Sequence, residues 1–425
     1  MPAPPEHAVA ESHIIARVHA SVLDVDPQAW NALLAHQAHA TPFMRHEYLA
    51  ALETSGSATP RTGWTPRFLT LWDAGVLVAA CPLYLKTHSY GEYVFDWAWA
   101  SAYEQHGVPY YPKALVAVPF TPVPGSRLLA RDATARAQLV QAARQWCMEE
   151  DISSLHLLFA ADEDIATCAD QGLMLRHTVQ FHWQNTTPVA PVMPSEATSE
   201  WLAMPNRFTS FDDFLASLAQ EKRKKIKQER RRVADAGVTF RCLQGKDIST
   251  GDWDFFYRCY ERTYLEHGNA PYLTRAFFAD MARTMPEAWV LFIAERDGNP
   301  IASSLIAISA CPASATGQKD TEIIAYGRYW GALERVDCLH FEACYYQPLQ
   351  WCIEHGVHRF EGGAQGEHKM ARALLPVQTS SAHWLAHPDF ADAVERFLER
   401  EGQGVDAYLQ SLHERAPFRK TQNPA

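Results

Sequence analysis

The residues best suited to chemistry lie in one short stretch, RFEGGAQGEHKMAR at 359–372. Glu361, Glu367 or His368 could take a proton from a reacting amine, and Lys369 and Arg372 could hold an anionic group. Glycines in the same stretch would let backbone N–H groups approach a carbonyl or phosphate oxygen closely. These residue types meet the needs of acyl transfer to an amine: a base, donors for the oxyanion and a proton for the leaving group.

Nucleotide-binding loops are excluded for this stretch. GGAQGEHK fits neither G-x-x-x-x-G-K-[ST] nor G-x-G-x-x-G. A tight strand exit capped by polar residues is the alternative to an active-site loop. The predicted substrate-binding residues here are Gly363, Gln365, Gly366, Lys369 and Arg372.

A second group of polar residues lies in IAYGRYWGALERVDCLHFEACYY at 324–346. His340 and Glu342 alternate with apolar residues just before a predicted helix, so one of them could face a cleft. Tyr326 is a candidate general acid. A purely structural role is the alternative for each of the three.

A basic run, EKRKKIKQERRR at 221–232, has eight basic and two acidic residues in a chain with a formal net charge of −11. A solvated helix face is the simplest interpretation. The alternative is a phosphate-binding stripe for tRNA, for coenzyme A or for an anionic membrane surface. The candidates are Lys222, Lys224, Lys225 and Arg230.

An aromatic-rich segment occupies 90–113, YGEYVFDWAWASAYEQHGVPYYPK. A buried wall is the default interpretation. A substrate groove is the alternative, because aromatic side chains with a few polar groups commonly line pockets. Asp96, Tyr110 and Tyr111 are then the predicted substrate-binding residues.

The elements that must position these residues follow one order twice: a hairpin, an aromatic-rich strand, a helix and a strand. The predicted hairpins are 67–86 and 289–309, the aromatic strands 93–100 and 322–330, the helices 135–150 and 341–356, and the closing strands 154–160 and 358–363. This repetition predicts two α/β domains of one kind, with mixed sheets.

The predicted N-terminal domain covers 14–185 and the C-terminal domain 207–420. A Pro/Ser/Thr-rich linker or surface insertion at 186–206 separates them. The second domain opens with one long basic helix at 211–236, and one or two helices follow at 391–414. A smaller insertion at 311–320 is expected to lengthen a hairpin loop.

Composition limits the class of protein. The 425 residues are 47% hydrophobic, and the nine cysteines include no C-x-x-C pair, which indicates reduced thiols. No signal peptide, no membrane span and no metal-ligand spacing is read, so we expect a cytoplasmic protein without a metal. No nucleophile motif is present either, which favours direct attack by the amine.

Several stretches together resemble the FemAB-like predicted N-acyltransferases, which are built from GNAT-type domains. The matching stretches are SYGEYVFDWAWA (89–100), YYPK (110–113), VPFTPVPGSRLL (118–129), FDDFLASL (211–218), YGRYWGALE (326–334), LHFEACYYQPLQW (339–351), FEGGAQGEHKMAR (360–372) and SSAHWLA (380–386). The resemblance implies tandem GNAT-like domains and transfer of an acyl group to an amine. The chain departs from the family at the insertion 186–206 and at Arg372-Ala373, where the family has Arg-Gly.

The resemblance also bears on the donor. Acyl-CoA-using GNAT enzymes carry a loop [RQ]-x-x-G-x-[GA] whose amides bind pyrophosphate. Arg328 and Gly331 lie in the corresponding place and keep only the first two anchor positions of that loop. They are the predicted donor-binding residues, while FemAB-type enzymes use aminoacyl-tRNA instead.

The sequence thus predicts an N-acyltransferase that uses acyl-CoA or aminoacyl-tRNA and a small-molecule or peptide amine acceptor. The alternatives are an aminoacyl-tRNA-dependent transferase acting on a cell-wall precursor, and a non-catalytic ligand-binding module of the same fold. The predicted catalytic residues are Glu342, Glu361, His340, His368 and Tyr326.

Overall fold

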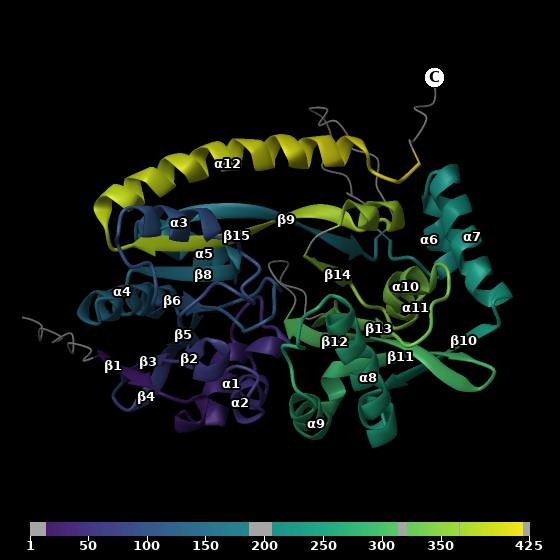
Figure 1. Ribbon diagram of the computed structural model, residues 1–425, viewed down its shortest axis with the longest axis horizontal. Coiled ribbons are helices and arrows are strands. Elements are labelled where there is room, and N and C mark those ends of the chain that lie inside the picture. The colour runs from purple at the N-terminus through teal and green to yellow at the C-terminus, as the bar shows by residue number, and fades with distance from the viewer. Residues whose placement is uncertain (1–13, 187–205, 313–320, 365, 420–425) are drawn as a thin grey trace, which may run out of the picture.

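The computed structural model describes residues 14–186, 206–312, 321–364 and 366–419 (Figure 1). We refer to 14–186 as the first half and to 206–419 as the second half. The predicted linker lies almost wholly outside these residues, as do most of the insertion at 311–320 and Gln365.

The elements of the first half are β1 (Ile14–His19), α1 (Pro27–Ala35), η2 (Pro42–Met44), α2 (His46–Thr54), β2 (Trp64–Pro66), β3 (Phe68–Asp73), β4 (Val76–Cys81), β5 (Leu83–Lys86), α3 (Trp97–Gln105), β6 (Lys113–Val116), β7 (Leu129–Ala130), α4 (Ala133–Glu149), β8 (Ser154–Ala160), α5 (Asp162–Asp170) and β9 (Met174–Gln184). Those of the second half are α6 (Phe211–Ser217), α7 (Gln220–Asp235), β10 (Val238–Gln244), η4 (Gly245–Asp247), α8 (Thr250–Glu266), α9 (Arg275–Thr284), η5 (Pro286–Ala288), β11 (Trp289–Arg296), β12 (Asn299–Pro312), β13 (Thr321–Ala332), α10 (Leu339–Phe341), η6 (Glu342–Tyr346), α11 (Gln347–Glu354), β14 (Arg359–Ala364), η7 (Glu367–Arg372), β15 (Leu375–Leu385) and α12 (Pro388–Glu414).

A long mixed sheet joins the two halves. Its strand order is β10-β11-β12-β13-β14-β9-β15-β8-β6-β5-β2, beside a separate four-stranded sheet β1-β3-β4-β7. Strand β15, near the end of the chain, lies between β8 and β9 of the first half and is antiparallel to both. Helix α12 runs along β15 and β9 and spans both halves (Figure 1). The second half therefore completes the sheet of the first.

Both predicted hairpins are confirmed, as β3–β4 and β11–β12. The strand at 322–330, the helix at 135–150 and the two closing strands also form, as β13, α4, β8 and β14. The predicted helix 341–356 forms in pieces. A π-helical turn, η6, leads into α11 with helical backbone angles at the junction, and Pro348, which has no N–H to donate, lies two residues after that turn.

The predicted strand at 93–100 is wrong, because Trp97–Gln105 form α3. Trp99 and Tyr103 lie four residues apart and are both buried, while Trp97 is 43% exposed. The run of aromatic residues looked like a strand, but its buried members have helical spacing.

The single long helix predicted at 211–236 is two helices, α6 and α7. Leu218 between them is extended and pairs with Phe418, and the N–H of Ala219 donates to the carbonyl of Pro417 at 2.9 Å. A contact with the end of the chain therefore breaks the helix, which local sequence does not reveal.

The halves also share a core. The ring of Phe43 packs edge-on against that of Tyr326 with centroids 5.3 Å apart, and Tyr48 packs against Phe277 at 5.2 Å. Elements of both halves thus pack on the same face of β12 and β13.

Candidate active site

The site is built where β13 and β14 separate. These parallel strands pair at only three positions, from Ile324↔Arg359 to Tyr326↔Glu361, and part after them. Ile306 of β12 faces Gly327 while Leu305 faces Tyr329, so Arg328 is the extra residue of a β-bulge in β13. We call the point of separation the seam and define it by Gly327, Gly362 and Gly363.

Glycine is required in the seam. A Cβ on Gly362 would come within 2.3 Å of the Leu374 side chain, and Gly363 has a φ of +77°. The seam is therefore bordered by backbone, which a substrate can approach closely.

On one face of the seam lies a cavity of about 270 Å³. Its polar lining residues include Arg328, His340, Tyr345, His368 and Lys369, and it reaches Gly327 and Gly362 of the seam. We call it the histidine cavity. The Tyr345 ring lies between the imidazoles of His340 and His368, at centroid distances of 5.9 and 6.1 Å, and its hydroxyl is 3.2 Å from His368 Nε2.

The imidazoles at this cavity are held neutral. Burial and nearby charged groups lower the pKa of His340 and of His368 below the ordinary value, so near pH 7 both can accept a proton. Burial also lowers the pKa of Lys369 to about 8. Its ammonium donates a hydrogen bond to the Gly363 carbonyl at 2.9 Å, which directs this cation to the seam.

On the opposite face lies a second cavity, of about 220 Å³, which we call the Glu361 cavity. Side chains alternate along β14, so Arg359 and Glu361 line this cavity while Phe360 and Gly362 line the histidine cavity. Tyr326, His182 and Thr379 are also in its lining. Residues of both halves therefore enclose it.

Glu361 is a buried carboxyl group with one oxygen engaged. Arg359 Nε donates to Oε1 at 3.0 Å, whereas Oε2 accepts no hydrogen bond from any described residue. His182 Nε2 lies 3.9 Å from Oε2. Burial raises the pKa of Glu361 to about 7, although Arg359 acts in the opposite direction. This carboxylate suits a general base near neutral pH.

Glu342 does not line either cavity. Its carboxylate accepts hydrogen bonds from Arg230 Nε at 3.1 and 3.2 Å and from Gln347 Nε2 at 2.7 Å. It thus anchors η6, which carries Tyr345, to helix α7. His340, His368 and Lys369 share one cavity, whereas Glu361 and Tyr326 share the other; the hydroxyl of Tyr326 lies 3.2 Å from Ser309 Oγ.

Three other predicted binding residues are occupied by contacts of the fold. A Cβ on Gly331 would lie 1.8 Å from the Cys259 carbonyl, so this glycine packs closely on α8 and does not open a pyrophosphate loop. Arg372 donates to Glu229 at 2.9 Å and to the His368 carbonyl at 2.8 Å. Gly366, with a φ of +103°, lies directly under the His368 ring.

Ala373, the departure from the family pattern, has a φ of +61°. A positive φ is easy for glycine, the residue that the family has at this position, and unfavourable for alanine, so the backbone is strained at Ala373. The loop nevertheless keeps Lys369 in the cavity lining.

Arg328 connects the histidine cavity to the first half. Its Nη2 donates to the Phe120 carbonyl and to the Tyr329 hydroxyl, both at 3.2 Å, and its guanidinium stacks 5.0 Å from the Phe43 ring centroid. It orders the bulge and closes one side of the cavity.

The aromatic segment of the first half forms a buried polar network. Tyr110 donates to Asp96 at 2.6 Å, Lys113 forms ion pairs with Asp96 and Glu92, and the Tyr111 hydroxyl lies 2.8 Å from Ser89. None of the described cavities is lined by Asp96, Tyr110 or Tyr111. At these three residues the segment 90–113 therefore forms the buried wall of the default interpretation, and not the alternative substrate groove.

Helix α7 separates its charges by face. Its inner face packs on η6 and η7, through Glu229 and Arg230. On its outer face Lys224 and Lys225 are exposed, and these two and Lys222 form no ion pair with the described residues. An unpaired cationic surface thus lies beside the elements that line the histidine cavity.

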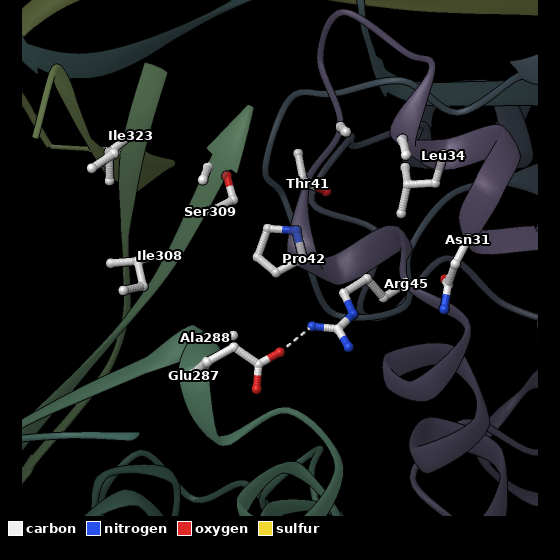
Figure 2. Close-up of a pocket in the computed structure, with 13 residues that line it drawn as sticks. Asn31, Leu34, Thr41, Pro42, Arg45, Glu287, Ala288, Ile308, Ser309 and Ile323 are labelled. Atoms are coloured by element: carbon white, nitrogen blue, oxygen red, sulfur yellow. Dashed lines mark hydrogen bonds and ion pairs between the residues drawn. The ribbon is translucent and has the colours of Figure 1, made fainter. Parts of the chain in front are cut away.

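A third cavity, of about 550 Å³, adjoins the Glu361 cavity, and Ala40 and Thr41 line both. We call it the apolar cavity, because Leu34, Pro42 and Ile308 are in its lining. Figure 2 shows that residues of the two halves face each other across it, with the Arg45–Glu287 ion pair, 2.5 Å long, at one side.

Sequence reasoning missed Arg359, His182 and Tyr345. The spacing of Arg359 and Glu361 on a predicted strand could have indicated that they share a face. His182 and the apolar cavity could not have been found, because the contacts involved join distant segments.

Within the described part of the chain no His, Cys, Asp or Glu cluster could hold a metal, and no helix is long and apolar enough to cross a membrane.

A family model matches most of the chain. The sequence matches the FemAB-like family, described as peptidoglycan biosynthesis/recognition, over residues 21–190 and 193–420. No curated protein sequence matches the chain.

Among solved structures, FemX is similar, with a TM-score of 0.51 at 10% identity over 87% of this chain and 98% of that one. A tandem GNAT protein from the clavulanic acid biosynthesis pathway has a TM-score of 0.41 at 13% identity, over 88% and 99% of the two chains. L-PGS from Bacillus licheniformis has a TM-score of 0.47 at 11% identity, over 88% of this chain and 97% of that one. The predicted mixed α/β fold is the observed one and is similar to that of FemX, and the chain belongs to the FemAB-like family, described as peptidoglycan biosynthesis/recognition.

Proposed function

We propose that the protein is an N-acyltransferase that joins an activated acyl group to an amine at the seam. The observation that carries the proposal is the pair of cavities on opposite faces of β13 and β14, with basic side chains on both sides. An amine and an acyl carbonyl can approach each other there without a covalent intermediate.

The donor binds on the side of the histidine cavity. Lys369 and the imidazoles face that cavity, and the cationic outer face of α7 lies on elements next to it. An anionic donor, acyl-CoA or aminoacyl-tRNA, suits this charge distribution. Aminoacyl-tRNA is the second candidate donor. The lysines on the outer face of α7 form no ion pair within the described part of the chain, and such cations can bind the phosphates of RNA.

The amine enters from the Glu361 cavity. Its nitrogen attacks the carbonyl carbon, the free Oε2 of Glu361 accepts the proton that the nitrogen loses, and the bond to sulfur or to the ribose oxygen breaks. Lys369 supplies a proton to the leaving group and becomes neutral. The amide product and the free thiol or tRNA then leave.

The test is a direct assay with each donor class. The full-length protein is incubated with an acyl-CoA or an aminoacyl-tRNA and a mixture of amines, and amide formation is followed by mass spectrometry. We expect amides from one donor class. If neither donor yields a product but a donor or an amine still binds, the chain is a non-catalytic binding module and the proposal is wrong.

A further inference from the structure

The Glu361 cavity and the apolar cavity together have a chemical character that the family alone does not predict. They adjoin each other between the halves at Ala40 and Thr41, which line both. One end of this pair holds the buried carboxyl group of Glu361, while the other is walled mostly by aliphatic side chains such as Leu34, Pro42 and Ile323.

The polar end has unsatisfied groups. Glu361 is 4% exposed and its Oε2 accepts no hydrogen bond within the described part of the chain. The Thr41 hydroxyl, at the junction of the two cavities, is also buried without a described partner. Buried polar atoms are nearly always hydrogen-bonded, so both atoms indicate a ligand with donors at that position.

The apolar end is too large and too apolar for a small polar amine. About 550 Å³ falls within the range of cavities that enclose whole small-molecule ligands. The Arg45 and Glu287 side chains, both in its lining, are paired with each other across the halves and so are satisfied without a ligand. The unpaired hydrogen-bonding groups therefore lie at the Glu361 end, and the apolar surface lies in the adjoining apolar cavity.

We propose that the acceptor is an amphipathic primary amine, with its nitrogen at Glu361 and an apolar chain in the apolar cavity. That the amine is the acceptor rests on the proposed function. Its binding requires no donor and no turnover and can be measured separately. The chain length of the amine, rather than a second polar group, then determines affinity.

The first test uses n-alkylamines from butylamine to decylamine as probes and measures their affinities by calorimetry on the full-length protein without a donor. Each added methylene that enters the cavity should tighten binding by about fourfold. Octylamine should bind more tightly than octanol, and the Glu361→Gln variant should remove that difference. Affinities that do not depend on chain length would overturn the proposal.

The second test blocks the cavity. Ala35 is an exposed residue at the end of α1 that lines the apolar cavity, so Ala35→Trp should weaken octylamine binding at least tenfold. Ala32→Trp, on the exposed side of the same helix and outside the lining, is the matched control and should leave binding unchanged. Equal affinities for the two variants would contradict the proposal.

The two claims fail separately. Chain-length-dependent binding without any amide product from either donor would support this inference and contradict the proposed function. Amide formation from polar amines, with alkylamine affinities that do not depend on chain length, would support the proposed function and contradict this inference.

Discussion

At the scale of single residues, alternation along β14 determines which side chain serves which cavity. Arg359 and Glu361 face the Glu361 cavity between the halves, and Gly362 faces the histidine cavity. The sequence shows the order of the candidate bases but not the sheet that divides them between the two cavities. In the proposed reaction the donor and the amine therefore occupy opposite faces of the sheet and meet at the seam.

Lys369 should act as the proton donor to the leaving group. The Lys369→Met variant keeps the buried alkyl chain but removes the ammonium, so we expect kcat to fall about 100-fold. Burial lowers the pKa of Lys369 to about 8, so the wild-type rate should decline as pH rises through 8 and this limb should disappear in the variant. Lys246→Met, at an exposed lysine on η4, is the control. An unchanged kcat in Lys369→Met would remove the residue from the mechanism.

Glu342 should be a positioning residue. The Glu342→Gln variant leaves the partly buried Arg230 guanidinium with a weaker partner, and the free energy of unfolding should fall by about 1 to 2 kcal/mol in chemical denaturation. Because η6 carries Tyr345 into the cavity, kcat/KM should fall modestly while both pH limbs stay in place. A lost pH limb would show that Glu342 itself transfers the proton.

At the scale of elements, the sequence predicted types better than boundaries. Hairpins and long amphipathic helices were predictable because turn residues and periodicity are local signals. The helix α3 and the break between α6 and α7 were not, since burial of Trp99 and the contact of Leu218 with Phe418 depend on distant segments. The separation of β13 and β14 likewise follows from tertiary packing.

Helix α7 provides a test of the donor. If the donor is aminoacyl-tRNA, changing both Lys224 and Lys225 to Ala should weaken tRNA binding and make the dependence of log K on log salt shallower by about 1.4 to 1.8. Replacing Lys246 by Ala should have little effect. Filter binding at several salt concentrations measures both quantities. Unaltered tRNA affinity in the double variant would favour acyl-CoA.

At the scale of the whole molecule, the two halves depend on each other. Strand β15 lies between β8 and β9, and without it the sheet of the first half would have two unpaired edges. The predicted boundaries at 185 and 207 thus divide the chain along its sequence, but they do not divide the structure, because one sheet contains strands of both halves.

The full chain should therefore unfold in a single cooperative transition, and residues 1–186 alone should not fold. Differential scanning calorimetry of the full chain and circular dichroism of the fragment measure this. Two separate transitions, with one reproduced by the fragment, would show that the halves are independent.

The central claim is that Glu361, on the opposite face of the seam from Lys369, takes the proton from the amine. The most direct measurement is the pH dependence of kcat/KM for amide formation by the wild type and by Glu361→Gln, whose amide can still accept the Arg359 hydrogen bond. Because burial raises the pKa of Glu361 to about 7, the wild-type rate should rise as pH increases through 7. The variant should lose that limb and about 100-fold or more in rate. A variant with the wild-type rate and the same rise near pH 7 would contradict the account.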